Sequence, residues 1–505
     1  MSQRQHPNAS RREFLRRAGA FGATGVAAPL AASLAGIGSA AAQAATGYKA
    51  LVCIFLYGGN DAYNTVLATD SDSWSHYLAA RDTIALRAPG TPPLLSAGGG
   101  SPDRLGGVLA IAPARPQGRR FALHPVMTGA RDLFESRRLA VVANVGPLLR
   151  PTSKAQYQNE KFAKPAKLFS HNDQTSTWQA GKPEGAAVGW GGRMADLLAQ
   201  SNRRAIFTSI SASGNAVWLS GNEVLQYQVS TRGAIHIGSW GNTLYGSTEA
   251  LARMHNVMRR ARSSRLLEQD HSAVAGRSID AEATLSAALP AGDAAPYGTP
   301  GAPNGQDPLL QYDNPLSGAK ATNPLAQQLQ IVARIIGARG GLGAQRQVFF
   351  VSLGGFDTHS DQARTQADNM ARLSHGLKYF NDALTAMGVA GGVTTFTASD
   401  FGRTFTSNGD GSDHGWGAHH FVMGGAVQGG DIYGNFPVYS QCDAQGNFAS
   451  PNQIDNGSML PEVSVDQYAA TMARWFGVAD DQLPELFPNL LNFSPALRNL
   501  GFMAA

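Results

Sequence analysis

The chain contains little cysteine, few charged side chains and no long apolar run beyond its first residues. Two cysteines, Cys53 and Cys442, in 505 residues exclude a disulfide scaffold, although the sequence leaves open whether these two pair. Charged residues make up only 15% of the chain. After residue 44 no apolar stretch approaches the roughly 18 residues that a membrane-spanning helix needs, so we expect no such helix there.

The excess of positive charge lies almost entirely in the first residues. The formal charge is +5, and residues 1–44, with five arginines and one glutamate, contribute +4 of it. The remaining chain is close to neutral. The composition therefore gives no reason to expect a nucleic-acid partner.

Residues 1–44 have the order of features found in a twin-arginine export signal. Arg11 and Arg12 lie in a basic segment, a weakly apolar run follows over residues 18–42, and small residues near Ala42 and Ala44 offer cleavage sites. The expected partner during export is the twin-arginine translocase. We expect a periplasmic or secreted protein without a stable membrane anchor after cleavage.

Replacing Arg11 and Arg12 together by lysine should trap the precursor in the cytoplasm, because the export signal depends on the arginine pair. Cell fractionation followed by immunoblotting measures this. The matched change of Arg16 and Arg17 to lysine should leave export intact. Normal export of the first double variant would remove the twin-arginine interpretation.

Five short apolar runs predict buried strands, and amphipathic segments between them predict helices. Strands are expected at residues 50–56, 139–145, 205–210, 347–353 and 393–397. Helices are expected at residues 324–340, 361–387 and 464–477. This alternation indicates an α/β fold whose mostly parallel sheet is covered on both faces.

Residues 45–505 are expected to form a single α/β domain. Within it, residues 266–325 are rich in Ala, Gly, Pro and Asp, a composition typical of loops. We therefore expect a flexible insertion around 266–325.

Three of the expected strands lead into loops that carry a carboxylate. Asp61 follows the first strand, Asp357 and His359 follow the fourth, and Asp400 follows the fifth. Ligands of an open parallel sheet bind outside the carboxyl ends of its strands. These four side chains are therefore expected to converge at one edge of the sheet.

Three of the twelve histidines lie within residues 414–420. With the carboxylates they form a nitrogen and oxygen donor set that suits Zn²⁺ or Mn²⁺ better than Ca²⁺. Neighbouring residues of an extended segment face opposite ways. We therefore expect His419 and His420 to face opposite ways. The choice of His419 as the inward metal ligand, with His414 as the second candidate and His420 as its supporting neighbour, follows from the family resemblance described below.

Simpler structural roles remain open at the same positions. Asp61 can cap the helix that follows it, and Asp357 and His359 can cap the helix at 361–387. The histidine-rich segment 414–420 can be a hydrogen-bonded loop. Each residue alone is ambiguous, and the prediction rests on their grouping.

A second polar group begins at Ser170 and His171, where a loop is expected to meet a helix. A hydroxyl at a helix N-terminus can act as a nucleophile, and it can equally cap the helix, with Asp173 in the first turn. Arg403, which follows Asp400 by three residues, is a candidate for stabilising an oxyanion, as is His171.

These motifs resemble those of the bacterial family known as domain of unknown function 1501. The resemblance rests on the leader and on residues 57–65 (YGGNDAYNT), 170–181, 354–362 (GGFDTHSDQ), 399–404 (SDFGRT) and 413–425 (DHGWGAHHFVMGG). It covers nearly the whole chain after the leader. That family is similar to the alkaline phosphatase and sulfatase superfamily, which implies a three-layer α/β fold with a mostly parallel central sheet and helices on both faces.

The superfamily pattern also implies roles for individual residues. Ser170 is the position that best matches its nucleophile. Its metal ligands match Asp61, Asp357, His359, Asp400 and either His414 or His419. Phe401 stands where the pattern has a histidine, and the gap from Asp357 to His359 is shorter than in phosphatases. A one-metal site and a degenerate site are therefore both open.

The expected function is that of an exported, metal-dependent hydrolase of phosphate or sulfate esters, with Zn²⁺ or Mn²⁺ as the cofactor. The alternative is a non-catalytic periplasmic protein that uses the same fold for binding or assembly with an envelope partner. A sugar-binding protein is a third possibility, since Trp178, Trp190 and Trp416 could stack on sugar rings.

Overall fold

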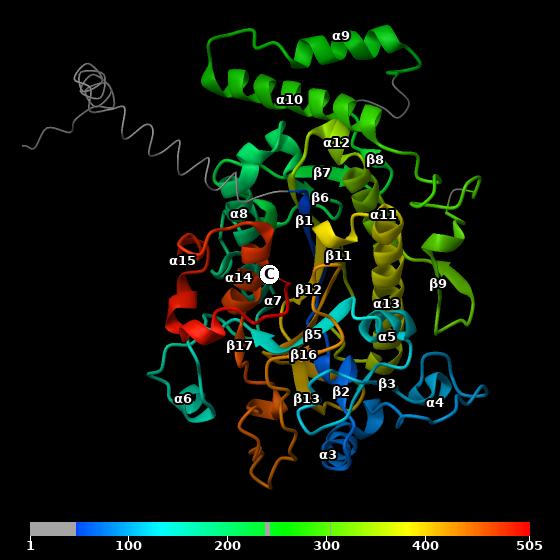
Figure 1. Cartoon of the computed structure of the whole chain (residues 1–505), viewed down its shortest axis with the longest axis vertical. Helices are drawn as coiled ribbons and strands as arrows, with labels where there is room; N and C mark the ends of the chain where they lie inside the picture. Colours follow the sequence, from blue (N-terminus) through cyan, green and yellow to red (C-terminus); the bar gives the residue numbers. More distant parts are fainter. Residues whose placement is uncertain (1–46, 238–242, 304, 505) are drawn as a thin grey trace, which may run out of the picture. The chain divides into compact units, whose positions relative to one another are not determined.

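The computed structural model describes residues 47–237, 243–303 and 305–504, so the expected leader lies outside the described residues. From Tyr48 onward the chain forms one compact unit around a central sheet, in which ten strands are described (Figure 1). In spatial order the strands are β16 (Ile432–Tyr433), β5 (Leu139–Gly146), β15 (Ala418–Gly424), β12 (Val393–Ser399), β1 (Lys49–Leu56), β11 (Arg346–Leu353), β6 (Ser209–Ser211), β7 (Tyr227–Ser230) and β8 (Gly233–Ala234), with β17 (Val463–Ser464) also paired to β5.

Most neighbouring strands of this sheet are parallel, as the sequence predicts. β1 pairs in parallel with both β11 and β12, so the carboxyl ends of these three strands lie side by side at one edge. β15 is the exception in the middle of the sheet, because it runs antiparallel to β12 and β5. The residues just before β15 therefore reach the same edge as the residues just after β12.

Helices cover both faces of the sheet and make a three-layer α/β fold. Along β1, Val52 and Ile54 pack into one hydrophobic core with α5 (Thr128–Glu135), α11 (Pro324–Gly337) and α13 (Gln362–Ala386). Cys53 and Phe55 pack into another with α7 (His171–Ala180), α8 (Trp190–Leu198) and α14 (Val465–Phe476). Figure 1 shows α11 and α13 on one side of the strands and α8 and α14 on the other. The layered fold that the sequence predicts is confirmed.

The helices of the described chain are α3 (Ser71–Arg81), α4 (Pro102–Leu105), α5 (Thr128–Glu135), α6 (Lys154–Gln158), α7 (His171–Ala180), α8 (Trp190–Leu198), α9 (Thr248–Met258), α10 (Leu266–Ala288), α11 (Pro324–Gly337), α12 (Arg339–Leu342), α13 (Gln362–Ala386), α14 (Val465–Phe476) and α15 (Leu483–Leu486). Three small antiparallel sheets accompany them: β2 (Val66–Ala68), β4 (Phe121–Leu123) and β3 (Leu109–Ile111); β9 (Gln311–Asp313) and β10 (Lys320–Thr322); β13 (Arg403–Ser407) and β14 (Ser412–His414).

The long helix α13 follows directly from its sequence. Leu373, Leu377 and Phe380 recur at helical spacing and are all buried against the sheet. The N-cap position of the helix is Asp361, whose side chain makes no capping hydrogen bond, and not Asp357 or His359. The capping role considered for Asp357 and His359 is therefore wrong, and both residues belong to the loop after β11.

Two local expectations are wrong. Residues 205–210 form a 3₁₀ turn (Ala205–Phe207) before the short strand β6, because the Asn202 side chain hydrogen-bonds both backbone groups of Arg346, where a longer strand would pair. Residues 266–288 form helix α10 instead of a flexible insertion. Alanine is the strongest helix former, Gly276 is the only glycine within residues 266–288, and the prolines of this region begin only at Pro290.

Within the described residues, no helix has the length and apolar character that crossing a bilayer requires. Cys53 is buried in β1 and Cys442 is exposed, and both are free thiols. The two cysteines therefore do not form a bridge.

Candidate functional site

The loops after β1, β11 and β12 meet at the carboxyl edge of the sheet, and two further elements close the site. The N-terminus of α7 contributes His171, and the hairpin of β13 and β14 contributes Arg403 and His414, which face each other in its register. Gly58, after β1, has a φ of +115°, and a Cβ there would lie 2.3 Å from the backbone nitrogen of Asp357. Only glycine lets the first loop approach the second so closely.

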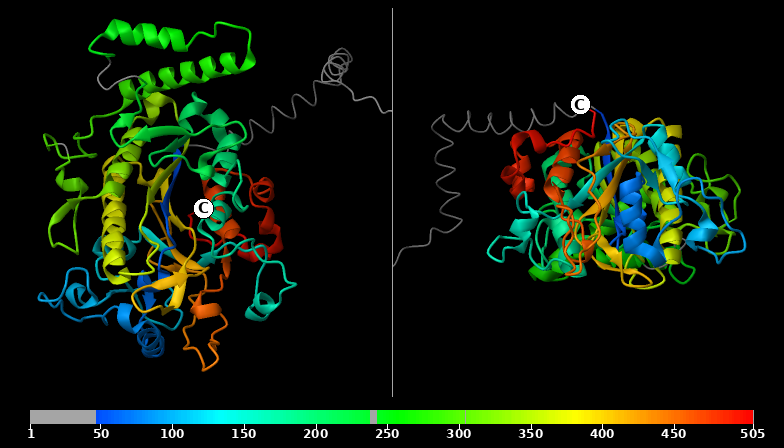
Figure 2. Two further views of the ribbon diagram at one scale, coloured as in Figure 1. Left: turned by 180° about the vertical axis from the view of Figure 1, so that it is seen from behind. Right: turned by 90° about the horizontal axis from the view of Figure 1, so that it is seen from below.

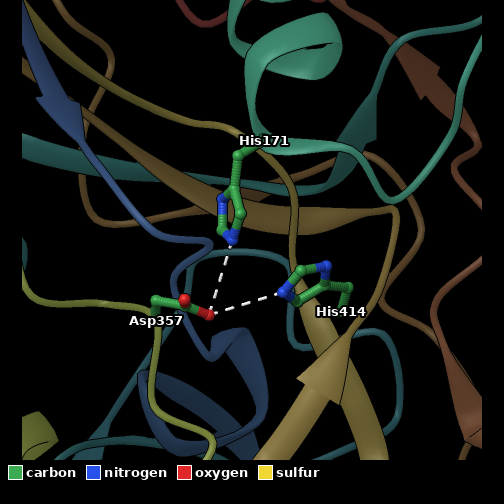
Figure 3. Close-up of side chains that lie close together, drawn as sticks. All are labelled: His171, Asp357 and His414. Atoms are coloured by element: carbon green, nitrogen blue, oxygen red, sulfur yellow. Dashed lines mark ion pairs between the residues drawn. The ribbon is translucent and has the colours of Figure 1, made fainter.

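Three side chains from distant parts of the chain converge on one point (Figure 3). Asp357 Oδ1 lies 3.5 Å from His171 Nε2 and 3.4 Å from His414 Nε2. All the donor atoms of this group lie within 4.8 Å of one another, as in a metal site. We call these residues the His–Asp cluster.

His359 lies next to the His–Asp cluster. Its Nε2 lies 3.1 Å from Asp357 Oδ1 and 3.0 Å from His414 Nε2, while its Nδ1 lies 3.2 Å from Asp413 Oδ1. His414 Nδ1 lies 2.8 Å from the carbonyl oxygen of Phe169, to which it donates. His414 Nε2 therefore carries no hydrogen, and its lone pair can bind a metal ion.

Asp400 orients His171. The Nδ1–H of His171 donates to Asp400 Oδ2 over 2.7 Å, and the backbone N–H of Gly58 donates to the same oxygen over 3.2 Å. The hydrogen bond to Asp400 raises the pKa of His171, and burial opposes this. His171 Nε2 and Asp400 Oδ1 are buried and have no hydrogen-bond partner among the described residues.

Arg403 is buried behind the cluster. Its guanidinium donates to Asp357 Oδ1 over 3.1 Å and to the carbonyl oxygen of Gly58 over 3.0 Å, and its Nε bonds Ser412. Burial raises the pKa of Asp357, but the hydrogen bond and charge of Arg403 outweigh it, and the net shift is downward. Arg403 therefore keeps Asp357 ionised and has little capacity left for an external anion.

A pocket of about 500 Å³ opens beside the His–Asp cluster. Its walls include His171, Asp357 and Asp400 from the cluster side, and Thr175 and Glu184 on and after α7. Neither lysine nor arginine lines the pocket in the described part of the chain. The pocket walls carry three carboxylates, so an anionic ligand needs another source of positive charge there.

The donor atoms of the His–Asp cluster suit a divalent cation. Nitrogen ligands lie about 2.0–2.1 Å from Zn²⁺, so four ligands at the corners of a tetrahedron are about 3.3 Å apart. Asp357 Oδ1 lies 3.5 Å from His171 Nε2 and 3.4 Å from His414 Nε2, close to this spacing. His359 Nε2 lies near Asp357 and His414 but is not part of the group whose donor atoms all lie within 4.8 Å of one another, so it is a neighbour of the three-residue donor set. A ligating histidine whose other nitrogen donates to a carboxylate or carbonyl is also the usual arrangement, as in His171 and His414.

Asp61 does not join the cluster, contrary to the sequence-based expectation. It is fully buried, with Oδ1 accepting from the N–H of Tyr63 at the cap of the turn Ala62–Asn64 and Oδ2 paired with Arg81 and Gln362. Burial raises the pKa of Asp61, and the charges of Arg81 and Arg403 oppose this. The capping role that the sequence left open is the correct one.

His419 is also misplaced by the sequence analysis. It is buried, its ring stacks on Phe436 at 4.5 Å, and its Nδ1 accepts from the N–H of Asn144. His420 faces the opposite way and packs on Trp178. Burial lowers the pKa of each histidine to about 3, so both stay neutral in the core.

Ser170 lies at the N-cap of α7, next to His171, but its hydroxyl donates to Asp173 Oδ2 over 2.8 Å. It is not among the residues that line the pocket. Thr175, one turn after His171 on the same helix face, supplies a pocket-lining hydroxyl instead. The i, i+4 spacing of His171 and Thr175 is the sequence signal for this placement.

Phe401 occupies the place where the superfamily pattern has a histidine. Its ring lies 4.7 Å from that of His171 and 4.6 Å from that of His414, and it packs against Gly59, where a Cβ would come within 2.4 Å of the ring. It forms an apolar wall beside the two histidines, whose rings lie 4.5 Å from each other. Trp178, Trp190 and Trp416 are each buried in the core, so none is exposed to stack on a sugar.

Sequence patterns do not reveal the residues whose role depends on tertiary contacts. Arg81, fully buried, is the partner of Asp61, and the Gly58 N–H holds Asp400. No spacing rule connects Arg81 to Asp61 across 20 residues. Asp413, which accepts from His359, belongs to the segment that the sequence analysis singled out.

Comparisons with solved structures return distant overlaps. Ps i-CgsB in complex with k-i-k-neocarrahexaose is 9% identical, with 89% of this chain and 78% of that chain covered and a TM-score of 0.34. A second structure, BT33494S-sulf, comes from work on the metabolism of multiple glycosaminoglycans by Bacteroides thetaiotaomicron. It is 10% identical, with 87% of this chain and 76% of that chain covered and a TM-score of 0.31. A search of curated proteins gives no match.

A family model matches most of the chain. It spans residues 48–487, from the start of β1 to the end of α15, and so includes every member of the His–Asp cluster and every wall of the pocket. The chain belongs to the family described as protein of unknown function DUF1501.

Proposed function

We propose that the protein is an exported, metal-dependent hydrolase of phosphate or sulfate esters. The observation that carries the proposal is the convergent donor group of His171, Asp357 and His414, with His359 next to it, beside a pocket whose walls are otherwise acidic. A divalent cation held there would polarise the ester and lower the pKa of an attacking water or hydroxyl. The resemblance to the alkaline phosphatase and sulfatase superfamily favours this ester chemistry.

The protein's own residues supply the remaining roles. Asp400 fixes the tautomer and orientation of His171, so that Nε2 faces Asp357. Arg403 keeps Asp357 charged and in place. Thr175 offers the pocket-lining hydroxyl best placed to attack a bound ester.

Removal and return of the metal test the proposal. Purified protein should contain about one Zn²⁺ or Mn²⁺ per chain and should hydrolyse 4-nitrophenyl phosphate or sulfate. EDTA should abolish turnover, and the added metal should restore it. Inorganic phosphate should bind only to the metal-loaded protein, because the pocket has no lysine or arginine of its own among the described residues.

Replacing Ser170 by alanine should leave most of the hydrolysis intact, because its hydroxyl donates to Asp173 and does not line the pocket. We expect a loss of about 1 kcal/mol in the free energy of unfolding at most. Thr175→Val, on the same helix, should lower kcat by about 100-fold or more. Loss of turnover in Ser170→Ala with the fold preserved would restore Ser170 as the nucleophile.

A non-catalytic binding protein is the second candidate function. Two residues that the superfamily pattern uses favour it, because their side chains already have partners within the protein. Asp61 forms an ion pair with Arg81, and the Ser170 hydroxyl donates to Asp173. Such a protein would bind metal and phosphate in the assays above but turn over neither ester. The same experiment therefore separates the two functions.

A further inference from the structure

A helical hairpin far from the candidate site carries an unusual surface. Helices α9 and α10 contact each other and are joined by a turn at residues 259–265, and α10 rests on β8 and α12 (Figures 1 and 2). No residue of α9 is fully buried. The free end of this hairpin, residues 257–267, is called the hairpin tip below.

The hairpin tip exposes large apolar side chains. Leu266 and Leu267 are 82% and 87% exposed, and Val257 is 53% exposed. A single exposed leucine is ordinary on a protein surface, but two adjacent leucines at this exposure, together with a valine, form an unpartnered apolar edge. Burying this edge against a partner would be favourable.

The same tip is strongly basic. Residues 259–267 read RRARSSRLL, with four arginines and no acidic residue. Arg259 pairs with Asp280, whereas Arg260 and Arg265 are exposed and no carboxylate among the described residues pairs with either. Glu268 is the nearest acidic residue. Its carboxylate accepts hydrogen bonds within the turn, from the Ser263 hydroxyl and the Arg262 backbone N–H.

We propose that the hairpin tip docks reversibly on the surface of a lipid bilayer that contains anionic lipids. Arginines beside exposed leucines are what an interfacial segment needs, since the charges attract the headgroups and the leucines enter the boundary of the acyl chains. Charge complementarity favours an anionic occupant, because the tip carries four arginines, one of them paired with Asp280, whereas the rest of the chain after residue 44 has a formal charge of about −3. Leu266 and Leu267 favour a bilayer over a soluble polyanion, which would leave them in water.

The position of the hairpin suits such docking. α10 rests on α12, which leads into the start of β11, whereas the His–Asp cluster lies beyond the carboxyl ends of β1, β11 and β12. Figure 1 shows α9 and α10 at the top and β13, which borders the site, at the bottom. A protein docked by the hairpin tip would turn its pocket away from the membrane. This inference does not depend on the proposed hydrolysis.

Vesicle sedimentation of the full protein, purified from the cells that produce it, tests the proposal. Wild type should sediment with vesicles of phosphatidylglycerol and phosphatidylcholine but not with phosphatidylcholine alone. Each arginine near an anionic surface is worth about fivefold in binding, so Arg260→Ala with Arg265→Ala should weaken it about 25-fold. Leu266→Ser with Leu267→Ser should weaken it about tenfold or more.

Matched variants serve as controls. Any binding that comes from a retained leader is the same in all variants, so differences between them report on the hairpin tip. Leu94 and Leu95, 54% and 74% exposed, form a second leucine pair, and Arg120 and Arg150 are exposed arginines elsewhere. Leu94→Ser with Leu95→Ser, and Arg120→Ala with Arg150→Ala, should bind like wild type. Equal binding by all variants, or by both vesicle types, would overturn the proposal. A loss in the arginine variant alone would show that binding is purely electrostatic, with no insertion of the leucines, and would also overturn it.

Discussion

Replacing Asp357 by alanine should abolish metal binding and hydrolysis while leaving the protein folded. Asp357 Oδ1 is the atom that His171, His359 and His414 all approach, at 3.5, 3.1 and 3.4 Å. Loss of a residue that only orients a metal ligand costs about 10–100-fold in affinity, so loss of the ligand itself should exceed 100-fold. The side chain is about half exposed, but its removal takes a carboxylate partner from the buried guanidinium of Arg403, so we expect a measurable loss of folding free energy with the fold retained.

Metal titration by calorimetry and metal analysis of the purified variant measure this effect. His419→Leu is the informative comparison, because His419 lies in the core against Phe436 and should keep its metal. Thermal unfolding of both variants checks that the fold is intact. If Asp357→Ala retains metal while His419→Leu loses it, the metal centre is not the His–Asp cluster.

Acid should weaken the same metal binding. Asp400 raises the pKa of His171, so His171 gains a proton more readily as the pH falls, and a protonated imidazole cannot bind a cation. Protons and metal therefore compete at His171 Nε2. Affinity for Zn²⁺ should rise with pH through the titration range of this histidine.

The sequence predicted the parts of the site that depend on strand ends. Apolar runs followed by carboxylates placed Asp357 and Asp400 correctly, because parallel strands must deliver their carboxyl ends to one edge. It failed for His419, because nothing in residues 414–420 shows that β15 enters the sheet antiparallel from that edge. His414 lies before the strand and reaches the site, whereas His419 is already inside the sheet.

The sequence could not resolve Asp61, for a different reason. Whether a buried carboxylate binds a metal or forms an ion pair depends on which side chain lies opposite it. Here that side chain is Arg81, from the last turn of α3, and its contact with Asp61 arises only when α3 packs against β13. Local patterns of charge carry no information about such a tertiary contact.

Replacing Arg81 by methionine should destabilise the fold by about 3–5 kcal/mol, because it leaves Asp61 buried without its cation. Both side chains are fully buried, so solvent cannot compensate. Burial already raises the pKa of Asp61 above the usual range of an aspartate, and loss of Arg81 would raise it further. Because the folded state then binds the proton more tightly than the unfolded state, the deficit should grow as the pH rises above about 4 and be smallest in acid.

Urea unfolding at pH 7 and at pH 5 measures both the size and the pH dependence of this loss. The double variant Arg81→Met with Asp61→Asn removes both charges and should recover at least half of the lost stability, since a missing pair costs far less than a broken one. The double variant should also bind one metal per chain with the affinity of the wild type. A stable double variant that has lost its metal would show that Asp61 is a ligand after all, and that the ion pair with Arg81 is exchanged when the cation binds.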